Sequence, residues 1–304
     1  MKKSIFSFSA FIALMMSVLT ALVFTSCEKA IFSDDETTGE PNGNLRVQVF
    51  QIEQTPFGSL TRAAQPASET CTRLNFLIYN TDGSRAKMVN QTSDNAGFGT
   101  ASFQLDEGDY QLVVVGHSAN GNPTSTNPQK ISFTNAQGYT DTFLSSGDIT
   151  IEPEESWEVD VTLERIVALC RFVITDDIPA DVKKMQFYYT GGSGAFNAYT
   201  GLGSVNSKQT VTFDVASPSA VTDDGRQFDL YTFLHEQSDN IALKVTALDA
   251  SGNELYVREF DVPMEQNHIT WLTGAFFNGS GSSSTSVTSV TVNTDWTGET
   301  HLTF

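Results

Sequence analysis

The 304-residue sequence predicts an all-β protein made of two antiparallel β-sandwiches in tandem. Runs rich in Val, Ile, Phe and Tyr recur about every 8–12 residues, and Gly, Asn, Asp and Pro separate them. No segment keeps a sustained helical period. Without a 26-residue leader the chain has room for about two domains. We therefore expect residues 1–26 to be a signal peptide, 27–44 a tether, 45–156 one sandwich and 157–304 the other.

The strands can be placed from the sequence in order. Leu45–Ile52 alternates apolar and polar residues with period two, which is typical of a half-buried strand. The turns at 80–83 and 249–252 have the composition of hairpin connections. Residues 55–70 and 120–129 read as breaks, 177–184 as room for one helical turn, and 190–204 as a structured loop. The other predicted strands are 72–79, 84–89, 99–105, 110–115, 131–133, 142–144, 148–151, 185–190, 209–215, 228–234, 241–248, 255–262, 268–276 and 287–294.

The stretch from Trp157 to Thr175 is the ambiguous one. It follows Glu152-Pro-Glu-Glu-Ser156, the best candidate for a domain boundary, and its second half is apolar on both faces apart from Arg171. Helix competes with strand for such a run, but its β-branched residues favour strand. Two strands joined by a short bend, or one strand that spans both domains, would fit.

The N-terminus reads as an export signal that ends at a cysteine. Lys2 and Lys3 precede an apolar run to Phe24, and small residues then lead to Ser26 and Cys27. This pattern is typical of a signal peptide. The Cys27 thiol is the group there that can carry a diacylglycerol thioether, so we expect cleavage between Ser26 and Cys27 and a lipid anchor with palmitate-type acyl chains. An ordinary secretory signal with a chance cysteine is the alternative.

An acidic cluster follows the cysteine at Ser33, Asp34, Asp35 and Glu36. It resembles the signal by which Bacteroidetes lipoproteins reach the outer face of the outer membrane. An ordinary solvated spacer is the alternative. The tether of about 17 residues would span ~55–60 Å when extended.

The charge excludes some partners. The formal charge is −19, and loss of Lys2 and Lys3 brings it to −21. This balance argues against nucleic acid, because phosphate binding needs a basic face. Membrane attachment must then be covalent. Cys71 and Cys170 could form a disulfide, but two small buried apolar residues is the better interpretation.

No pattern points to catalysis, a metal or a cofactor. The histidines His117, His235, His268 and His301 are scattered, and we expect exposed positions at strand ends. Asp82, Asp94 and Asp249 fit turns better than a calcium loop. Gly191-Gly-Ser-Gly194 lacks the residues of a phosphate loop and suggests close loop packing. Trp157, Trp271 and Trp296 could stack on sugars, but packing in a core or interface fits their place in strands better.

Several segments in order resemble the anchor-subunit lipoproteins of Bacteroidales fimbriae, which are related to the fimbrillins. They are Thr25-Ser26-Cys27, 74–83, 108–117, 163–168 with its continuation to Pro179, 267–277 and 291–296. The resemblance implies two transthyretin-like β-sandwiches. It also implies a lipidated subunit at the base of a fimbrium that anchors the shaft, limits its length, and meets shaft subunits by β-strand addition or docking.

In related stalk subunits an arginine-specific protease removes the first strand. Arg46 and Arg62 are the matching candidates here, and cutting at either would separate the protein from its lipid. An uncut chain therefore suits an anchor. The alternatives are a polymerising or tip subunit cleaved after an arginine, and a surface glycan-binding lipoprotein. The tail that ends at Phe304 is either an intramolecular strand or a detachable donor.

Overall fold

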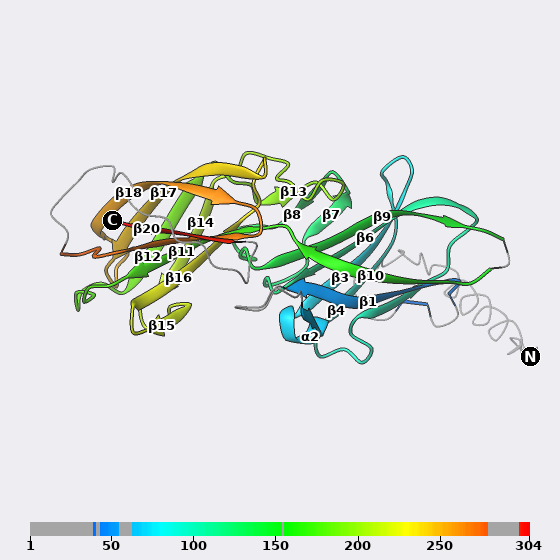
Figure 1. Cartoon of the computed structure of the whole chain (residues 1–304), viewed down its shortest axis with the longest axis horizontal. Coiled ribbons are helices and arrows are strands. Elements are labelled where there is room, and N and C mark those ends of the chain that lie inside the picture. The colour runs from blue at the N-terminus through cyan, green and yellow to red at the C-terminus, as the bar shows by residue number, and fades with distance from the viewer. Residues whose placement is uncertain (1–38, 41–42, 55–62, 154, 279–297) are drawn as a thin grey trace, which may run out of the picture. The chain divides into compact units, whose positions relative to one another are not determined.

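The computed structural model describes residues 39–40, 43–54, 63–153, 155–278 and 298–304. These residues form an all-β fold, as predicted, with one four-residue helix, α2 (Ala67–Thr70). Figure 1 shows the strands gathered into sheets, with β10 leading from the N-terminal half into the C-terminal half. Within the described ranges no helix is long and apolar enough to cross a membrane.

The N-terminal half, within residues 39–165, is built on one eight-stranded sheet. The order is β2-β1-β10-β9-β6-β3-β4, and β5 also pairs with β1. Its core contains Leu45, Phe76, Val114 and Leu163, all on inward faces. The strands of this half are β1 (Leu45–Gln54), β2 (Ala63–Gln65), β3 (Arg73–Asn80), β4 (Arg85–Thr92), β5 (Thr100–Phe103), β6 (Gly108–His117), β7 (Thr124–Asn127), β8 (Lys130–Ser132), β9 (Thr142–Ile151) and β10 (Trp157–Arg165).

The C-terminal half, residues 168–304, places two sheets over a second core. Their orders are β15-β16-β11-β19-β20 and β14-β12-β17-β18. Aromatic rings fill the space between them, with Phe172 in contact with Phe187, Phe260 and Phe304. The strands are β11 (Ala168–Ile174), β12 (Lys184–Thr190), β13 (Ala195–Phe196), β14 (Gln209–Asp214), β15 (Ala220–Thr222), β16 (Gly225–Thr232), β17 (Ser238–Leu248), β18 (Glu254–Glu265), β19 (His268–Gly274) and β20 (Gly298–Thr303).

The two halves share a small sheet and an apolar cluster, in addition to the covalent connection between them. Only Ile166 and Val167 separate β10 from β11, so the ambiguous stretch is two strands with a short bend. A small sheet, β13-β8-β7, combines strands of both halves. A third apolar cluster also draws on both, including Tyr79 and Phe133 from one half and Phe233 and Ile269 from the other. The boundary expected after Ser156 stays a prediction, and β10 beyond it pairs with β1 and β9.

Most predicted strands are present, with differences at their ends and in the breaks. Residues 142–144 and 148–151 form one strand, β9, and 177–184 contains a turn and no helix. The break at 55–70 holds β2 and α2 among its described residues, and 120–129 contains β7. The strand predicted at 287–294 lies outside the described residues.

Candidate functional site

β1 is hydrogen-bonded to neighbouring strands along both of its edges. It is the candidate site at which the folded body is joined to the N-terminal segment of the chain. β1 runs parallel to β10 from Leu45↔Trp157 to Ile52↔Leu163, with a bulge at Phe50. Its other edge pairs antiparallel with β5 and then with β2. Its inward side chains Leu45, Val47 and Ile52 are fully buried. Removing β1 would therefore expose the core and leave three ladders unpaired.

Residues just before β1 are also hydrogen-bonded to the folded body. The Asn44 side chain donates to the Leu105 carbonyl at 2.9 Å and accepts from the Leu105 N–H at 2.9 Å. The Asn44 carbonyl accepts from the Trp157 N–H at 2.8 Å, and the Glu40 N–H donates to Ser102 O at 2.9 Å. Among the described residues, contacts with the sheet thus already occur at Gly39, which bridges to Ser102 ahead of β1.

The two candidate cleavage positions differ in their surroundings. Arg46 lies within β1, its backbone opposite Glu158 on one side and Ser102 on the other. Its guanidinium lies 3.3 Å from the Glu158 carboxylate and is half exposed. Arg62 falls outside the described residues, between Gln54 at the end of β1 and Ala63 at the start of β2. Ser26, Cys27, Ser33, Asp34, Asp35 and Glu36 lie outside them too.

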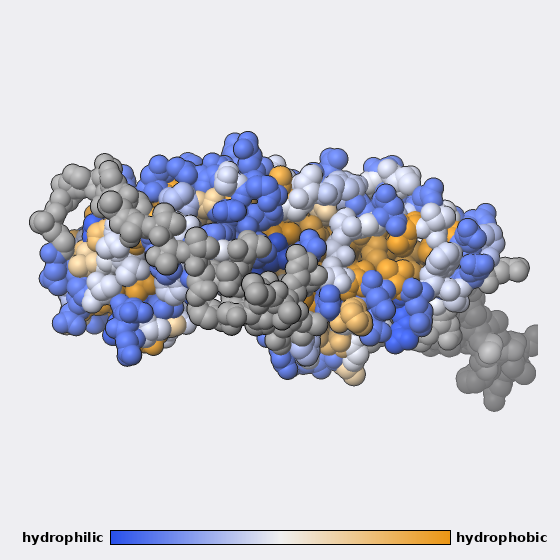
Figure 2. Space-filling model, in the orientation of Figure 1, coloured by the Kyte–Doolittle hydropathy of each residue, from blue (hydrophilic) through white to orange (hydrophobic). Residues whose placement is uncertain are grey.

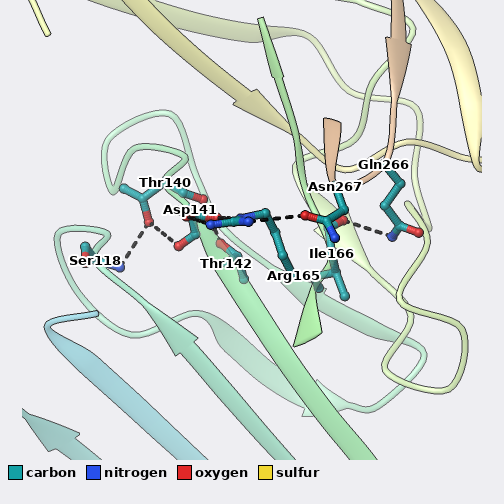
Figure 3. A network of polar contacts seen from close by, with 8 residues as sticks. All are labelled: Ser118, Thr140, Asp141, Thr142, Arg165, Ile166, Gln266 and Asn267. Atoms are coloured by element: carbon teal, nitrogen blue, oxygen red, sulfur yellow. Dashed lines mark hydrogen bonds and ion pairs between the residues drawn. The ribbon is translucent and has the colours of Figure 1, made fainter. Parts of the chain in front are cut away.

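A polar network holds the bend between the halves (Figure 3). Arg165 donates from Nε and Nη2 to the two Asp141 carboxylate oxygens at 2.7 and 2.8 Å, and from Nη1 to Asn267 Oδ1 at 3.2 Å. Asn267 has a φ of 56°, a left-handed conformation that Asn tolerates better than most residues. Its N–H donates to the Val167 carbonyl at 2.9 Å. The network thus ties β10 and the bend to the turn before β19.

Three backbone groups of the bend have hydrogen-bond partners: the Ile166 N–H and the carbonyls of Ile166 and Val167. The Ile166 N–H donates to Thr142 O at 3.0 Å. Gln266 Nε2 donates to the carbonyls of Ile166 at 3.1 Å and Gly201 at 3.0 Å. Figure 3 shows Gln266 and Asn267 reaching the bend from the opposite side to Asp141. Because buried backbone groups are costly to leave unpaired, these contacts favour one fixed arrangement of the bend.

The last strand is attached through a row of side chains across the outer face of its sheet. In register, Asp229 on β16 lies opposite Arg171, Arg171 opposite Trp271, and Trp271 opposite His301 on β20. Arg171 donates twice to Asp229 at 2.8 Å and lies 4.8 Å from the centre of the Trp271 ring. The His301 ring stacks on the Trp271 ring, and the two ring centres lie 5.3 Å apart. The tail at Phe304 is here an intramolecular strand parallel to β19.

The expected exposure of the strand-end histidines is wrong for two of them. His117 is fully buried and His268 is 9% exposed. His117 Nε2 donates to Asn75 Oδ1 at 2.9 Å, while Nδ1 accepts from the Ala119 N–H at 3.1 Å. Burial, with a contribution from Arg73, lowers the pKa of His117 to about 3. A neutral ring therefore acts as a hydrogen-bond connector in the core.

Other candidate residues have structural roles. Cys71 and Cys170 are free and are buried in different cores. They therefore do not form the disulfide that the sequence left open. Asp82 and Asp249 accept N–H bonds from their own turns. Gly192 is closely packed, because a Cβ there would lie 2.1 Å from Thr232 Oγ1. Trp157 and Trp271 are half-buried against apolar clusters, as expected for packing, and Trp296 lies outside the described residues.

Comparison with known proteins places the chain in a family. Residues 39–303 match the family of unknown function DUF6562, and the chain belongs to that family. A search of curated protein sequences finds no match.

Three solved structures are similar to parts of this chain at low sequence identity. A provisionally assigned cell adhesion protein from Bacteroides ovatus has a TM-score of 0.47 at 15% identity, covering 83% of this chain and 97% of its own. A provisionally assigned adhesin from the same species has 0.45 at 16%, covering 71% and 82%. The fimbrial anchor protein Mfa2 from Porphyromonas gingivalis has 0.41 at 13%, covering 70% and 80%. Two of these proteins are thus provisionally assigned to adhesion, and the third is a fimbrial anchor protein.

Proposed function

We propose that this protein is a non-enzymatic, lipid-anchored subunit that holds a fimbrium to the outer membrane at the cell surface and limits its length. The lipid would be carried by Cys27 after cleavage behind Ser26, and Ser33 to Glu36 would direct the protein to the outer face. Shaft subunits would meet it by β-strand addition or docking. The sequence resemblance to fimbrial anchor subunits motivates this role.

The observation that carries the proposal is the integration of β1. An anchor that is pulled by its fimbrium needs a continuous connection from its lipid to its folded body. β1 is the first strand of the described residues, and it pairs along both edges while burying Leu45, Val47 and Ile52. An anchor that keeps this strand keeps both its lipid and its core.

The same pairing bears on cleavage at Arg46. A protease binds its substrate as an extended, accessible segment, whereas the backbone at Arg46 is already paired with Glu158 and Ser102. Arg62 lies between β1 and β2, outside the described residues, and a cut there would also separate the chain after it from Cys27. We infer that the subunit stays uncut at both residues.

N-terminal analysis of the protein from purified fimbriae tests the proposal. The expected mature N-terminus is lipidated Cys27. An N-terminus at Val47 or Ala63 would instead identify a cleaved subunit. Deletion of the protein should release fimbriae from the cells or change their length, and attached fimbriae of normal length would contradict the anchor role.

A second candidate is a polymerising or tip subunit. It is favoured by β20, which pairs with β19 and, among the described residues, with no other strand. Such a terminal strand could leave and pair with a neighbour. The same N-terminal analysis separates the two functions, since this candidate requires a cut after Arg46 or Arg62.

A further inference from the structure

β9 and β10 are neighbours that pair over only a small part of their length. Among the described residues, their ladder consists of Leu144↔Glu164 and Phe143↔Arg165. Continued in the same register, it would place Gly147 opposite Val161 and Ile149 opposite Val159. The ladder stops instead, although β9 stays paired with β6 and β10 with β1. Each strand thus has one unpaired edge, at 145–151 and 157–163, and we name the opening between these edges the seam.

The seam gives access to apolar side chains. The inward positions of β10 are Trp157, Val159, Val161 and Leu163, and the first two are only half-buried. Ile149 on β9 is also half-buried and packs against the same core. Figure 2 shows apolar atoms gathered on this face of the N-terminal half, over the strands labelled β6, β9 and β10 in Figure 1.

The middle of the seam lacks side chains that would close it. The pleat places Ser145 and Gly147 on the inward face of β9, between the buried Phe143 and the half-buried Ile149. A Cβ added to Gly147 would meet no atom of the described part of the chain within 4 Å. The residue that would face Val161 in a continued ladder therefore leaves open space.

Acidic residues surround the seam. Glu158, Asp160 and Glu164 occupy the outward positions of β10 and are exposed, and Asp148 is exposed on β9. Glu158 pairs with the half-exposed Arg46. A ligand that covers the apolar residues would meet negative charge on its outer face.

These features match a β-strand better than another ligand. Unpaired strand edges offer N–H and C=O groups to a further strand. The free edge of β18, by contrast, is interrupted by Pro263 and by a bulge at Leu255, which are common protections against strand addition. The seam edges, 145–151 and 157–163, contain no proline.

We propose that the seam is an acceptor site for one β-strand of a partner polypeptide, with apolar residues at alternate positions and Lys or Arg between them. The strand pairs with the unpaired edge of β10, covers Val159 and Val161, and directs its basic side chains toward Glu158 and Asp160. The unpaired edge fits about seven residues. The identification of the partner as another fimbrial subunit rests on the function proposed above, whereas the site itself does not.

A synthetic peptide tests the site on the full mature chain in detergent. The probe is a fluorescent nine-residue peptide of alternating Val and Lys, and the control peptide has the same residues in two blocks. Anisotropy should show saturable binding of the alternating peptide and at least tenfold weaker binding of the block peptide. Hydrogen exchange should slow at 157–163. Equal binding of both peptides would mean simple charge attraction to an acidic chain and would overturn the proposal.

Two variants locate the binding. Gly147→Phe fills the open space of the seam and should weaken binding at least tenfold, while Ser146→Phe adds the same ring on the outward face and should stay within twofold. Val159→Lys provides a second test if Gly147→Phe unfolds, because it places a positive charge where the apolar side chains dock. Unchanged binding in a folded Gly147→Phe or Val159→Lys protein, or protection at β18 in place of β10, would overturn the site.

Cells separate the site from the anchor function. Fimbriae lost in Gly147→Phe cells as in deletion cells support a fimbrial partner at the seam. Fimbriae that remain attached in Gly147→Phe cells but are lost in deletion cells overturn the fimbrial partner, and the anchor function stands. Fimbriae that are normal in deletion cells overturn the anchor function, while the peptide experiment decides the site independently.

Discussion

Arg165 and Asp141 form a two-bonded ion pair beside the bend between β10 and β11, with N–O distances of 2.7 and 2.8 Å. The Arg165 side chain is 5% exposed and that of Asp141 is 24% exposed. The guanidinium also lies 5.0 Å from the centre of the Phe143 ring. The pair thus joins the end of β10 to the residue just before β9, next to the two residue pairs of the ladder that the described parts of these strands form.

Asp141→Ala should destabilise the protein strongly, because it removes the carboxylate that faces the buried Arg165. Removing one partner of a buried pair costs about 3–5 kcal/mol. Glu158→Ala removes the partner of an exposed pair and should cost less than about 1 kcal/mol. Urea unfolding of both variants measures the difference. Equal costs would show that the Arg165 pair adds no more than a surface contact.

The buried His117 should make stability fall in mild acid. Its pKa is about 3 in the folded chain, while an unfolded histidine titrates near ~6.5. As the pH drops from about 6.5 toward 3, the unfolded chain binds a proton that the folded chain does not, so folding loses up to ~1.4 kcal/mol per pH unit. Above about pH 6.5 this contribution is fully present. Urea unfolding at pH 7, 5.5 and 4.5 should show a shallower dependence for His117→Gln than for the natural chain, and identical slopes would contradict the buried neutral ring.

Neither Cys71 nor Cys170 should react with alkylating agents in the folded protein. Burial raises the pKa of each thiol to about 12, and the thiolate is the reactive form. At pH 8, peptide mapping should find both residues unlabelled without denaturant and fully labelled in guanidinium chloride. Labelling of either cysteine in the native chain would show that its core opens.

Gly274→Val should detach β20 from its sheet. A Cβ at Gly274 would lie 2.2 Å from the Phe304 carbonyl oxygen and 2.9 Å from two atoms of its ring, so the residue that directly follows β20 would have to shift. Overpacking of this kind costs about 1–3 kcal/mol. Amide exchange at Glu299–Thr303 should accelerate, while exchange in β3 and β6 stays unchanged. Thr303→Val, at an exposed position of β20, is the matched control and should leave exchange unaltered.

The sequence predicts strands well where one face is buried and alternation is visible. Leu45–Ile52 shows this pattern, and β1 covers it. It predicts poorly where a strand depends on distant partners. β20 reads Gly-Glu-Thr-His-Leu-Thr, which has little apolar alternation, and its place depends on Trp271, His268 and Phe172.

Buried polar residues were the other source of error. His117 resembles a surface residue by type, and its burial is satisfied by Asn75, which lies 42 positions earlier in the chain. The seam was not predicted either, because the early end of a ladder leaves little trace in the local sequence. Only the small Ser145 and Gly147 within an otherwise strand-like run offered a signal.

The parallel pairing of β1 with β10 determines how a pulling force enters the protein. A force that pulls on the chain ahead of Leu45 would act along the axis of β1, so it would load the hydrogen bonds to β10 in shear, together, instead of opening them one at a time. Because β10 continues through two residues into β11, the same force passes into the sheet of the C-terminal half. β1, β10 and β11 thus form a mechanical path that would resist separation of β1 from the folded body.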